Sequence, residues 1–283
     1  MSESLEDKQE TASERKASDD ALLKTRMGRV KHKIAVISGK GGVGKTLVTV
    51  NLATMLAREK GFGRVGLLDA DIHGPCVPKM LGLKGKRLEA SPAGIFPVYS
   101  DEGVKVISMA FLLPSDDSPV IWRGPVKMCA IKQLLSEVAW GELDYLLIDL
   151  PPGTGDEPLT VLQLLKDADG VIIVTIPSEV SGDVVRKAVT FARMLNIPVL
   201  GIVENMSGLV CPHCGEKIEV FEGGMGRKVA EDMGVPFLGS IPIDPRVSAA
   251  CDSGKPFVET YPDTLAAKSF GELVKKIMEI VER

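Results

Sequence analysis

The sequence lacks any apolar run long enough to cross a membrane, and no secretory signal peptide opens it. It also lacks an excess of one charge sign, because 34 Lys and Arg residues stand against 38 Asp and Glu residues, for a net charge of −4. That balance argues against a broad nucleic-acid-binding face. The cysteines are few and odd in number, five in all, which favours reduced thiols over a disulfide framework. We therefore expect a cytoplasmic protein that binds neither nucleic acid nor membrane.

The composition changes along the chain and suggests its domain organisation. Residues 1–30 are rich in Glu, Asp, Lys and Ser and have few apolar residues. We expect this part to be a flexible charged segment or a loose helix outside the core, or alternatively a docking arm. Residues 31–283 are long and apolar enough to form one domain.

Short runs rich in Val, Ile and Leu alternate with helical stretches after residue 30. This alternation predicts an α/β fold, a doubly wound and mostly parallel sheet with helices on both faces. The predicted strands cover residues 33–38, 64–69, 94–99, 104–109, 143–149, 170–176, 198–203 and 237–241. The predicted helices cover residues 46–60, about 125–138, 181–195 and 263–283. Mixed charges on the last helix favour packing against the sheet over membrane binding.

One octapeptide, GKGGVGKT at residues 39–46, follows a predicted strand and opens a predicted helix. It fits the phosphate-loop pattern G-x-x-x-x-G-K-S/T, in which glycines let backbone N–H groups surround an anion and the helix dipole adds to the attraction. We predict that ATP binds at Gly39, Lys40, Gly41, Gly42, Val43, Gly44, Lys45 and Thr46. Lys45 would be the catalytic lysine that neutralises the β- and γ-phosphates, and the Thr46 hydroxyl would bind Mg²⁺. The alternative is a glycine-rich turn that binds nothing.

Carboxylates lie at the ends of two predicted strands. Asp69 and Asp149 are the last residues of their strands, and Asp71 follows Asp69 closely. Because ligands of open α/β sheets bind beyond the carboxyl ends of the strands, we expect these groups near the phosphates. Asp71 is the candidate for orienting or activating the attacking water, Asp69 for holding a metal-bound water, and Asp149 for the Mg²⁺ environment of a phosphate-loop enzyme. Capping or turn formation is the alternative for Asp69 and Asp71.

Two further segments are predicted to meet the nucleotide. The loop 151–155, PPGTG, is rigid at its prolines and free at its glycines, as a γ-phosphate sensor should be. Asn205 lies at the end of another strand and offers an acceptor and a donor, the pairing that an adenine edge needs. A strand-end turn is the alternative for Asn205.

A single C-x-x-C motif, Cys211 and Cys214, lies in a segment that we interpret as an inserted metal-binding loop, at about residues 206–222. Two thiolates can point at one metal centre, but zinc and iron-sulfur sites usually take four ligands. His213, between the cysteines, would strain the turn if it reached the same centre. Two chains related by a twofold axis would supply four thiolates, so we expect a homodimer. A redox-active dithiol, a bridging structural zinc and a labile iron-sulfur cluster remain open as interpretations.

The octapeptide resembles the deviant phosphate loop of the MinD/ParA-type ATPases, in which a second lysine occupies the position of Lys40. That resemblance implies ATP-dependent homodimerisation, with Lys40 reaching across the interface to the partner's phosphates; a solvated lysine is the alternative. Further motifs resemble the Mrp/ApbC family of phosphate-loop ATPases that carry iron-sulfur clusters. In chain order they are DADIHGP (69–75), WRGP (122–125), LDYLLIDLPPGTGD (143–156), ENMS (204–207) and CPHCG (211–215).

The Mrp/ApbC resemblance implies a homodimer that holds a bridging 4Fe-4S cluster, hydrolyses ATP slowly and transfers the cluster to apo iron-sulfur proteins. By position it implies Cys211 and Cys214 as the cluster ligands. Zinc is the alternative metal in the protein as purified. The positions that it implies for nucleotide and Mg²⁺ are Lys40, Lys45, Thr46, Asp71 and Asp149, with Asn205 for the base.

Two departures from the family pattern narrow this interpretation. Residues 1–30 contain no cysteine, so the extra ferredoxin-like cluster site of the related eukaryotic scaffold branch is not expected. Cys76 stands where the family more often has serine, and we expect a small half-buried residue there; an accessory ligand and a redox-sensitive thiol are the alternatives. The rival functions are a MinD/ParA-type positioning ATPase that binds membrane or DNA, and a reductase that couples ATP to electron transfer. The first is opposed by the overall acidity, the mixed-charge tail and the cysteine pair. The second is opposed because the two cysteines share one tight turn instead of coming from separate loops.

Overall fold

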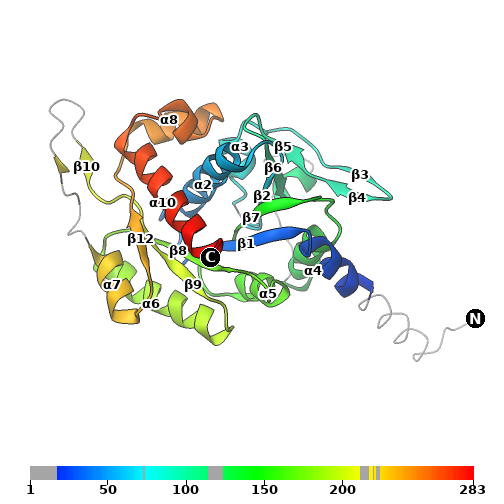
Figure 1. Cartoon of the computed structure of the whole chain (residues 1–283), viewed down its shortest axis with the longest axis horizontal. Helices are drawn as coiled ribbons and strands as arrows, with labels where there is room; N and C mark the ends of the chain where they lie inside the picture. The colour runs from blue at the N-terminus through cyan, green and yellow to red at the C-terminus, as the bar shows by residue number, and fades with distance from the viewer. Residues whose placement is uncertain (1–17, 73, 114–123, 211–216, 219, 221–223) are drawn as a thin grey trace, which may run out of the picture.

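An eight-stranded sheet forms the centre of the protein in the computed structural model, which describes residues 18–72, 74–113, 124–210, 217–218, 220 and 224–283 (Figure 1). Its strand order is β12-β9-β8-β1-β7-β2-β6-β5, and every neighbouring pair is parallel except β5 with β6. The strands are β1 (Val30–Ser38), β2 (Val65–Asp69), β5 (Val98–Tyr99), β6 (Val104–Ser108), β7 (Leu143–Asp149), β8 (Gly170–Thr175), β9 (Val199–Glu204) and β12 (Phe237–Ser240). Short antiparallel pairs in the described chain are β3 (Glu89–Ser91) with β4 (Gly94–Phe96), and β10 (Leu209–Val210) with β11 (Lys217–Ile218).

The central strands are buried on both faces, as expected for a parallel sheet between two helical layers. In β1, Ile34 and Val36 pack into one core, whereas Ala35 and Ile37 pack into the other. This division follows because successive side chains of a strand point to opposite faces. The sheet therefore separates two hydrophobic cores.

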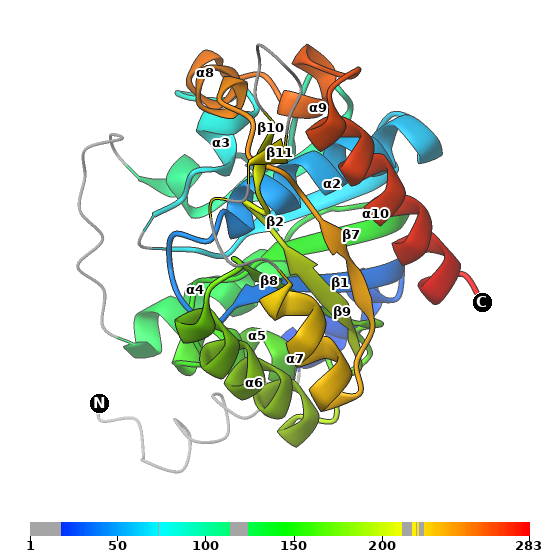
Figure 2. The same ribbon diagram turned by 90° about the vertical axis from the view of Figure 1, so that its left-hand side faces the viewer.

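Helices cover both faces of the sheet (Figures 1 and 2). The first core is closed by α2 (Lys45–Lys60), α3 (Val77–Met80), α8 (Arg246–Ser253), α9 (Phe257–Thr260) and α10 (Leu265–Val281). The second core is closed by α4 (Gly124–Ser136), α5 (Asp156–Leu164), α6 (Glu179–Met194), α7 (Met225–Met233) and the helix at residues 18–27. A short 3-10 helix, Met109–Leu112, follows β6. This architecture confirms the predicted doubly wound, mostly parallel α/β fold.

The helix at residues 18–27 departs from the expectation of a loose segment outside the core. Leu23 and Met27 are only 7% and 3% exposed and pack in the same core as α4. Lys132 of α4 also forms an ion pair with Asp20 at 2.8 Å. Leu23 and Met27 are four positions apart and therefore share one helical face, an apolar stripe that the charged composition conceals. The expectation is thus wrong for residues 18–27, and residues 1–17 lie outside the described residues.

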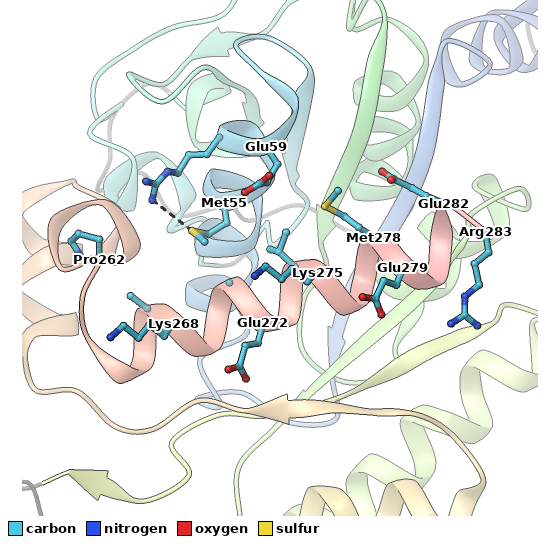
Figure 3. Close-up of a pocket in the computed structure, with 14 residues that line it drawn as sticks. Met55, Glu59, Pro262, Lys268, Glu272, Lys275, Met278, Glu279, Glu282 and Arg283 are labelled. Atoms are coloured by element: carbon cyan, nitrogen blue, oxygen red, sulfur yellow. Dashed lines mark hydrogen bonds between the residues drawn. The ribbon is translucent and has the colours of Figure 1, made fainter.

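The last helix, α10, packs its apolar stripe into the first core beside α2, in agreement with the packing predicted from its mixed charges. A groove of about 1140 Å³ runs between α2 and α10 and is lined by charges of both signs, among them Arg58, Glu272 and Lys275 (Figure 3). The groove meets α2 at residues 55–59, which lie about 15 to 21 Å along the helix from its N-terminus. Within the described ranges, no helix is both long and apolar enough to span a bilayer.

Candidate functional site

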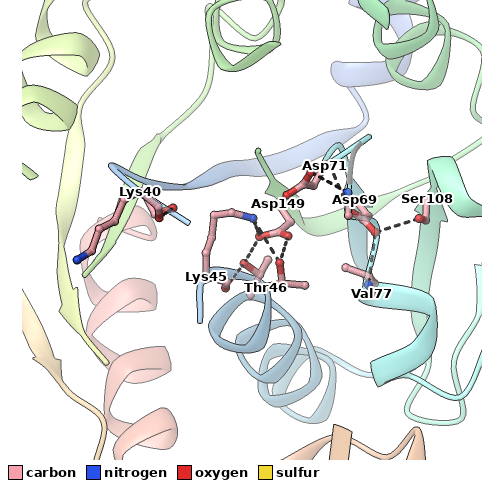
Figure 4. A network of polar contacts seen from close by, with 11 residues as sticks. Lys40, Lys45, Thr46, Asp69, Asp71, Val77, Ser108 and Asp149 are labelled. Carbon is pink, nitrogen blue, oxygen red and sulfur yellow. Dashed lines mark hydrogen bonds and ion pairs between the residues drawn. The ribbon is translucent and has the colours of Figure 1, made fainter. Parts of the chain in front are cut away.

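The carboxyl ends of β1, β7, β2 and β6 lie side by side and bring polar groups to one edge of the sheet (Figure 4). Asp149 of β7 is in register with Asp69 of β2, which is in register with Ser108 of β6. On its other side Asp149 is in register with Val36 of β1, and the predicted phosphate loop begins at Gly39, just after that strand. The parallel register therefore places the loop, two aspartates and a serine hydroxyl next to one another.

The loop 39–46 has the backbone of an anion cradle. Gly42 and Gly44 have φ angles of 77° and 79°, in the left-handed region that glycine adopts at little cost. Helix α2 then starts at Lys45, and no side chain caps its first N–H groups. These N–H groups and the helix dipole favour an anion at this end of α2. A Cβ placed on Gly41 would meet nothing closer than 3.9 Å, so the loop has open space on that side.

The Asp149 carboxylate is fully buried and contacts three side chains of α2. Lys45 Nζ forms an ion pair with its Oδ1 at 2.8 Å, and Thr49 Oγ1 donates to the same oxygen at 2.8 Å. Thr46 Oγ1 donates to Asp149 Oδ2 at 2.6 Å. Lys45 is itself only 6% exposed, so the two opposite charges neutralise each other away from water. An arriving phosphate would offer Lys45 a second anion close to the first.

The oxygen atoms at this edge fit the chemistry of Mg²⁺, which prefers oxygen ligands and commonly combines one or two protein oxygens with phosphates and waters. The Thr46 hydroxyl and the Asp149 carboxylate are adjacent and belong to this donor class. Among the residues that the structure describes, no group of three or more His, Cys, Asp or Glu side chains is arranged to hold a metal ion.

Asp69 is fully buried beside Asp149. Burial, and then the negative charge of Asp149, raise the pKa of Asp69 to about 8, so this carboxyl carries a proton at neutral pH. Ser108 Oγ donates to Asp69 Oδ2 at 2.9 Å, and the backbone N–H of Asp71 donates to Oδ1 at 3.3 Å. The Asp71 side chain is half-buried and accepts from the N–H of Gly74 at 3.2 Å. Asp69 is thus enclosed by protein, whereas Asp71 lies on the loop where water reaches it.

The two lysines of the loop point in different directions. Lys45 faces Asp149, while Lys40 points away from both of them (Figure 4). The Lys40 backbone is fixed by the Ser38 hydroxyl, which donates to the Lys40 carbonyl at 3.0 Å. Lys40 therefore does not duplicate the position of Lys45 within one chain.

Asn205 lies directly after β9 and against the phosphate loop. Its side chain is 3% exposed, and its Nδ2 donates to the carbonyl of Val43 at 2.9 Å. A Cβ on Gly44 would collide with the same nitrogen, so the glycine permits this close approach. The backbone N–H of Asn205 donates to the carbonyl of Thr175, the last residue of β8, at 2.8 Å. The structure thus places Asn205 on the loop backbone, and its contact with an adenine edge stays a prediction.

Ser108 and Thr49 are residues of this edge that the sequence patterns did not single out. Thr49 follows Lys45 by one helical turn, and this spacing is the signal that indicates a shared face of α2. Ser108 ends β6, so its place at the carboxyl end of a parallel strand is the signal for it. The predicted sensor loop lies beside the start of the phosphate loop, because the N–H of Gly153 donates to the carbonyl of Ser38 at 2.8 Å.

The two cysteines of the C-x-x-C motif, Cys211 and Cys214, lie outside the described residues. The paired strands β10 and β11 flank them in sequence, with Leu209 in register with Ile218. Cys76 was expected to be half-buried, but the structure shows it exposed, because it precedes the short helix α3 on a surface loop.

The family model and the related proteins that match this chain point to the same family. The ParA family model, described as NUBPL iron-transfer P-loop NTPase, matches residues 29–278. The iron-sulfur cluster carrier protein of Methanocaldococcus jannaschii is 53% identical over 266 residues, which cover 94% of this chain and 90% of that protein. The iron-sulfur cluster carrier protein of Saccharolobus solfataricus is 52% identical, over 93% of this chain and 88% of that protein.

Solved structures share the fold. A nucleotide-binding protein of Archaeoglobus fulgidus in complex with ADP is 41% identical, with a TM-score of 0.75 over 88% of this chain and 98% of that one. The cell division ATPase MinD of Pyrococcus furiosus is 24% identical, with a TM-score of 0.65 over 88% of this chain and 99% of that one, a likeness that shows the fold alone. The chain therefore belongs to the ParA-type family of iron-transfer P-loop NTPases.

Proposed function

We propose that this chain is an ATP-hydrolysing iron-sulfur cluster carrier, which holds a 4Fe-4S cluster between the Cys211 and Cys214 pairs of two copies and transfers it to apo iron-sulfur proteins. The observation that carries this proposal is one phosphate loop and one C-x-x-C motif in a chain more than half identical to two proteins named iron-sulfur cluster carriers. We place its activity in the reducing cytoplasm, where thiols stay free.

The phosphate loop would bind ATP with the groups that surround it. We assign Lys45 to the β- and γ-phosphates, because it already lies 2.8 Å from an anion at this edge. Thr46 would coordinate Mg²⁺, with Asp149 beside it, and the bound ion would neutralise phosphate charge. Asp71 lies on the loop where water reaches it, so we assign it to orienting the attacking water and accepting its proton.

Two buried groups complete the nucleotide assignment. Asp69, whose pKa burial raises to about 8, is assigned to holding a metal-bound water near the phosphates, to which its protonated form would donate a hydrogen bond. Asn205 is held on the phosphate loop at Val43 and is assigned to the adenine base. Both side chains are fixed by the ends of parallel strands, which gives the site a rigid frame.

The homodimer follows from the number of thiolates. A 4Fe-4S cluster takes four cysteine ligands, and the single motif of one chain supplies two. Lys40 points away from the Lys45 side of its own loop, which supports a role toward the phosphates of a partner chain (Figure 4). We therefore propose that ATP binding and cluster binding both involve the pairing of two copies.

We also propose that residues 31–283 act as one ATPase domain with a metal-binding insertion at about residues 206–222. Strands β10 and β11 support this division, because they pair with each other and stand outside the eight-stranded sheet. Residues 18–27 pack on this domain, in the same core as α4.

Anaerobic reconstitution with iron and sulfide tests the cluster assignment. The wild type is expected to bind about four iron and four sulfide per two chains, to show cluster absorption and to elute as a dimer. Cys211→Ala and Cys214→Ala should lose the cluster and keep their affinity for ATP. Cys129→Ala, at an exposed thiol of α4, is the matched control and should keep the cluster. A cluster retained in Cys211→Ala, or zinc as the sole bound metal, would overturn the assignment.

Transfer needs its own experiment. Loaded protein is mixed with an apo iron-sulfur enzyme, and the recovery of that enzyme's activity is followed with and without MgATP. We expect recovery that a chelator does not prevent when the carrier is in direct contact with the recipient. Recovery that the chelator abolishes would mean that iron is released to solvent, and the carrier function would be rejected.

A further inference from the structure

Glu204, the last residue of β9, has a buried carboxylate to which the nucleotide assignment gives no role. It is 1% exposed, and Ser207 Oγ donates to its Oε1 at 2.9 Å. The backbone N–H of Gly226 donates to Oε2 at 2.7 Å, and that of Gly224 donates to Oε1 at 3.4 Å. A buried carboxylate is costly unless hydrogen bonds and a favourable dipole compensate it. Helix α7, which begins beside these N–H groups, supplies both.

The hydrogen-bond donors to Glu204 lie on both sides of the β10–β11 pair in the chain. Ser207 precedes β10, whereas Gly224 and Gly226 follow β11 and lead into α7. A single carboxylate at the end of β9 therefore binds both the beginning and the end of the segment 207–226, which contains β10 and β11. Glu204 also caps α7, because it accepts from the N–H of Gly226 in the first turn of the helix and from that of the N-cap residue Gly224.

The close approach at Gly226 shows that this point is tightly built. A Cβ on Gly226 would lie 3.1 Å from both Cβ and Oε2 of Glu204, and 3.3 Å from Cγ2 of Thr175. The backbone also holds the beginning of the segment 207–226 in place, since the N–H of Ser207 donates to the carbonyl of Ile241 at 2.9 Å. The base of the β10–β11 hairpin is thus held against the ends of β8 and β9 rather than loosely attached to them.

The next residue in the chain connects this point to the phosphate loop. Asn205 Nδ2 donates to the carbonyl of Val43, and the Asn205 N–H donates to the carbonyl of Thr175. Two consecutive side chains therefore hold two different features: Asn205 holds the phosphate loop, and Glu204 holds both ends of the hairpin. A change in the loop backbone at Val43 would therefore act on Asn205, the residue next to Glu204.

We propose that Glu204 is a positioning residue that transmits the state of the phosphate loop to the β10–β11 hairpin. When nucleotide rearranges the loop at Val43, Asn205 follows the carbonyl to which it donates, and Glu204 shifts both ends of the hairpin together. Cys211 and Cys214 lie between the two strands in sequence, so this contact gives ATP a route to change how the cluster is presented. In that last respect the inference rests on the proposed carrier function.

Hydrogen–deuterium exchange of the cluster-free full chain, with and without saturating MgADP, tests the inference. In the wild type, nucleotide should slow exchange of the amides of residues 207–226 by at least about threefold. Glu204→Gln keeps the shape of the side chain but loses the charge that attracts the N–H groups of α7. Its response at residues 207–226 should fall below about 1.5-fold, while its affinity for MgADP stays within about threefold of wild type.

The controls separate coupling from stability. Glu231→Gln neutralises an exposed carboxylate of α7 and should keep the full response. If Glu204→Gln folds poorly, Ser207→Ala removes one donor, leaves the carboxylate, and should reduce the response by about half. A destabilised Glu204→Gln that keeps the full response would show a purely structural role and overturn the inference, as would a wild-type hairpin indifferent to MgADP. No iron is used, so the outcome does not depend on whether the cysteines bind a cluster.

Discussion

Lys45 and Asp149 form a buried ion pair at the carboxyl edge of the sheet, with Nζ 2.8 Å from Oδ1 and with side-chain exposures of 6% and 0%. The pair connects the first residue of α2 to the last residue of β7. It keeps the lysine beside the phosphate loop instead of free in solvent, which reduces the side-chain entropy lost when phosphates bind. The same pair makes the nucleotide-free protein sensitive to the charge of Asp149.

Asp149→Asn tests that sensitivity, because it leaves Lys45 buried without its anion. The nucleotide-free variant should be about 2–4 kcal/mol less stable than wild type in urea unfolding. ATP is added without Mg²⁺, because Asp149 is also assigned to the Mg²⁺ environment. It should then stabilise the variant more than the wild type relative to its own nucleotide-free form, because the phosphates replace the lost anion.

Thr49→Val is the matched control for this substitution. It removes one hydrogen bond to the same carboxylate and keeps the ion pair, so the cost should be about 1 kcal/mol with an unchanged gain from ATP. Equal stabilisation by ATP in Asp149→Asn and wild type would mean that the phosphates do not meet Lys45.

The sequence predicts those parts of the fold that a local hydrophobic pattern and the parallel register of neighbouring strands determine. The apolar run ending at Asp149 is the strand β7 as expected, and its parallel neighbours bring Asp69 to the same edge. Helices α5 and α7, of 9 residues each, are too short to show a clear helical period and were not predicted.

Contacts between distant side chains are the part that sequence patterns cannot supply. Asn205 and Val43 are 162 positions apart, and no local signal shows that their backbone and side chain meet. The role of Glu204 is hidden for a related reason, since its donors are a hydroxyl and backbone N–H groups that any sequence possesses. Buried hydrogen bonding depends on the finished packing, whereas strand and helix periods do not.

Two glycines of the phosphate loop should respond differently to a methyl group. A Cβ on Gly39 would lie 2.7 Å from the backbone oxygen of Val184 in α6, so Gly39→Ala should cost about 1–3 kcal/mol of stability. A Cβ on Gly41 meets nothing closer than Pro152 at 3.9 Å, so Gly41→Ala should fold within about 0.5 kcal/mol of wild type. Its methyl group would instead occupy the anion cradle and weaken ATP binding by about tenfold or more.

Urea unfolding and ATP titration of the two glycine variants check this contrast. Gly39→Ala is expected to be less stable than wild type, and any loss of ATP affinity in this variant should result from that lost stability. If Gly41→Ala bound ATP as tightly as wild type, the open side of the loop would not be where the phosphates lie.

Lys40 and Lys45 should have separable roles in hydrolysis. Lys45→Ala should weaken ATP binding by at least about tenfold, because it removes the charge beside the loop. Lys40→Ala should bind ATP within about threefold of wild type and hydrolyse it at least about tenfold more slowly, since the missing charge would come from the partner chain.

Mixing two inactive variants decides whether Lys40 acts across the dimer. In a mixed dimer of Lys40→Ala and Asp71→Asn, the site of the first chain keeps Asp71 and receives Lys40 from the second. An equimolar mixture should recover roughly a quarter of the wild-type ATPase rate, because half of the dimers are mixed and one site in each is complete. A lysine that acts within its own chain would give no recovery.

The buried carboxyl of Asp69 should make stability depend on pH. Burial raises its folded-state pKa to about 8, so the folded protein retains a proton that the unfolded chain releases at much lower pH. The contribution is fully present below the unfolded pKa and is lost as pH rises through the folded pKa. This group alone should therefore lower the free energy of unfolding between about pH 4 and 8, with a slope approaching about 1.4 kcal/mol per pH unit.

Asp69→Asn isolates this term, because an amide keeps the shape of the carboxyl and still accepts from Ser108 but cannot ionise. Measured by urea unfolding without nucleotide or Mg²⁺, the stability of the Asn variant relative to wild type should rise from about pH 5 to 8 and then level off. Ser108→Ala removes a donor that favours the charged form of Asp69, so its stability should stop falling only at a higher pH than that of wild type. Parallel pH profiles for wild type and Asp69→Asn would mean that the carboxyl is ionised throughout this range, and Asp69 could then no longer be assigned the donation of a hydrogen bond to a water near the phosphates.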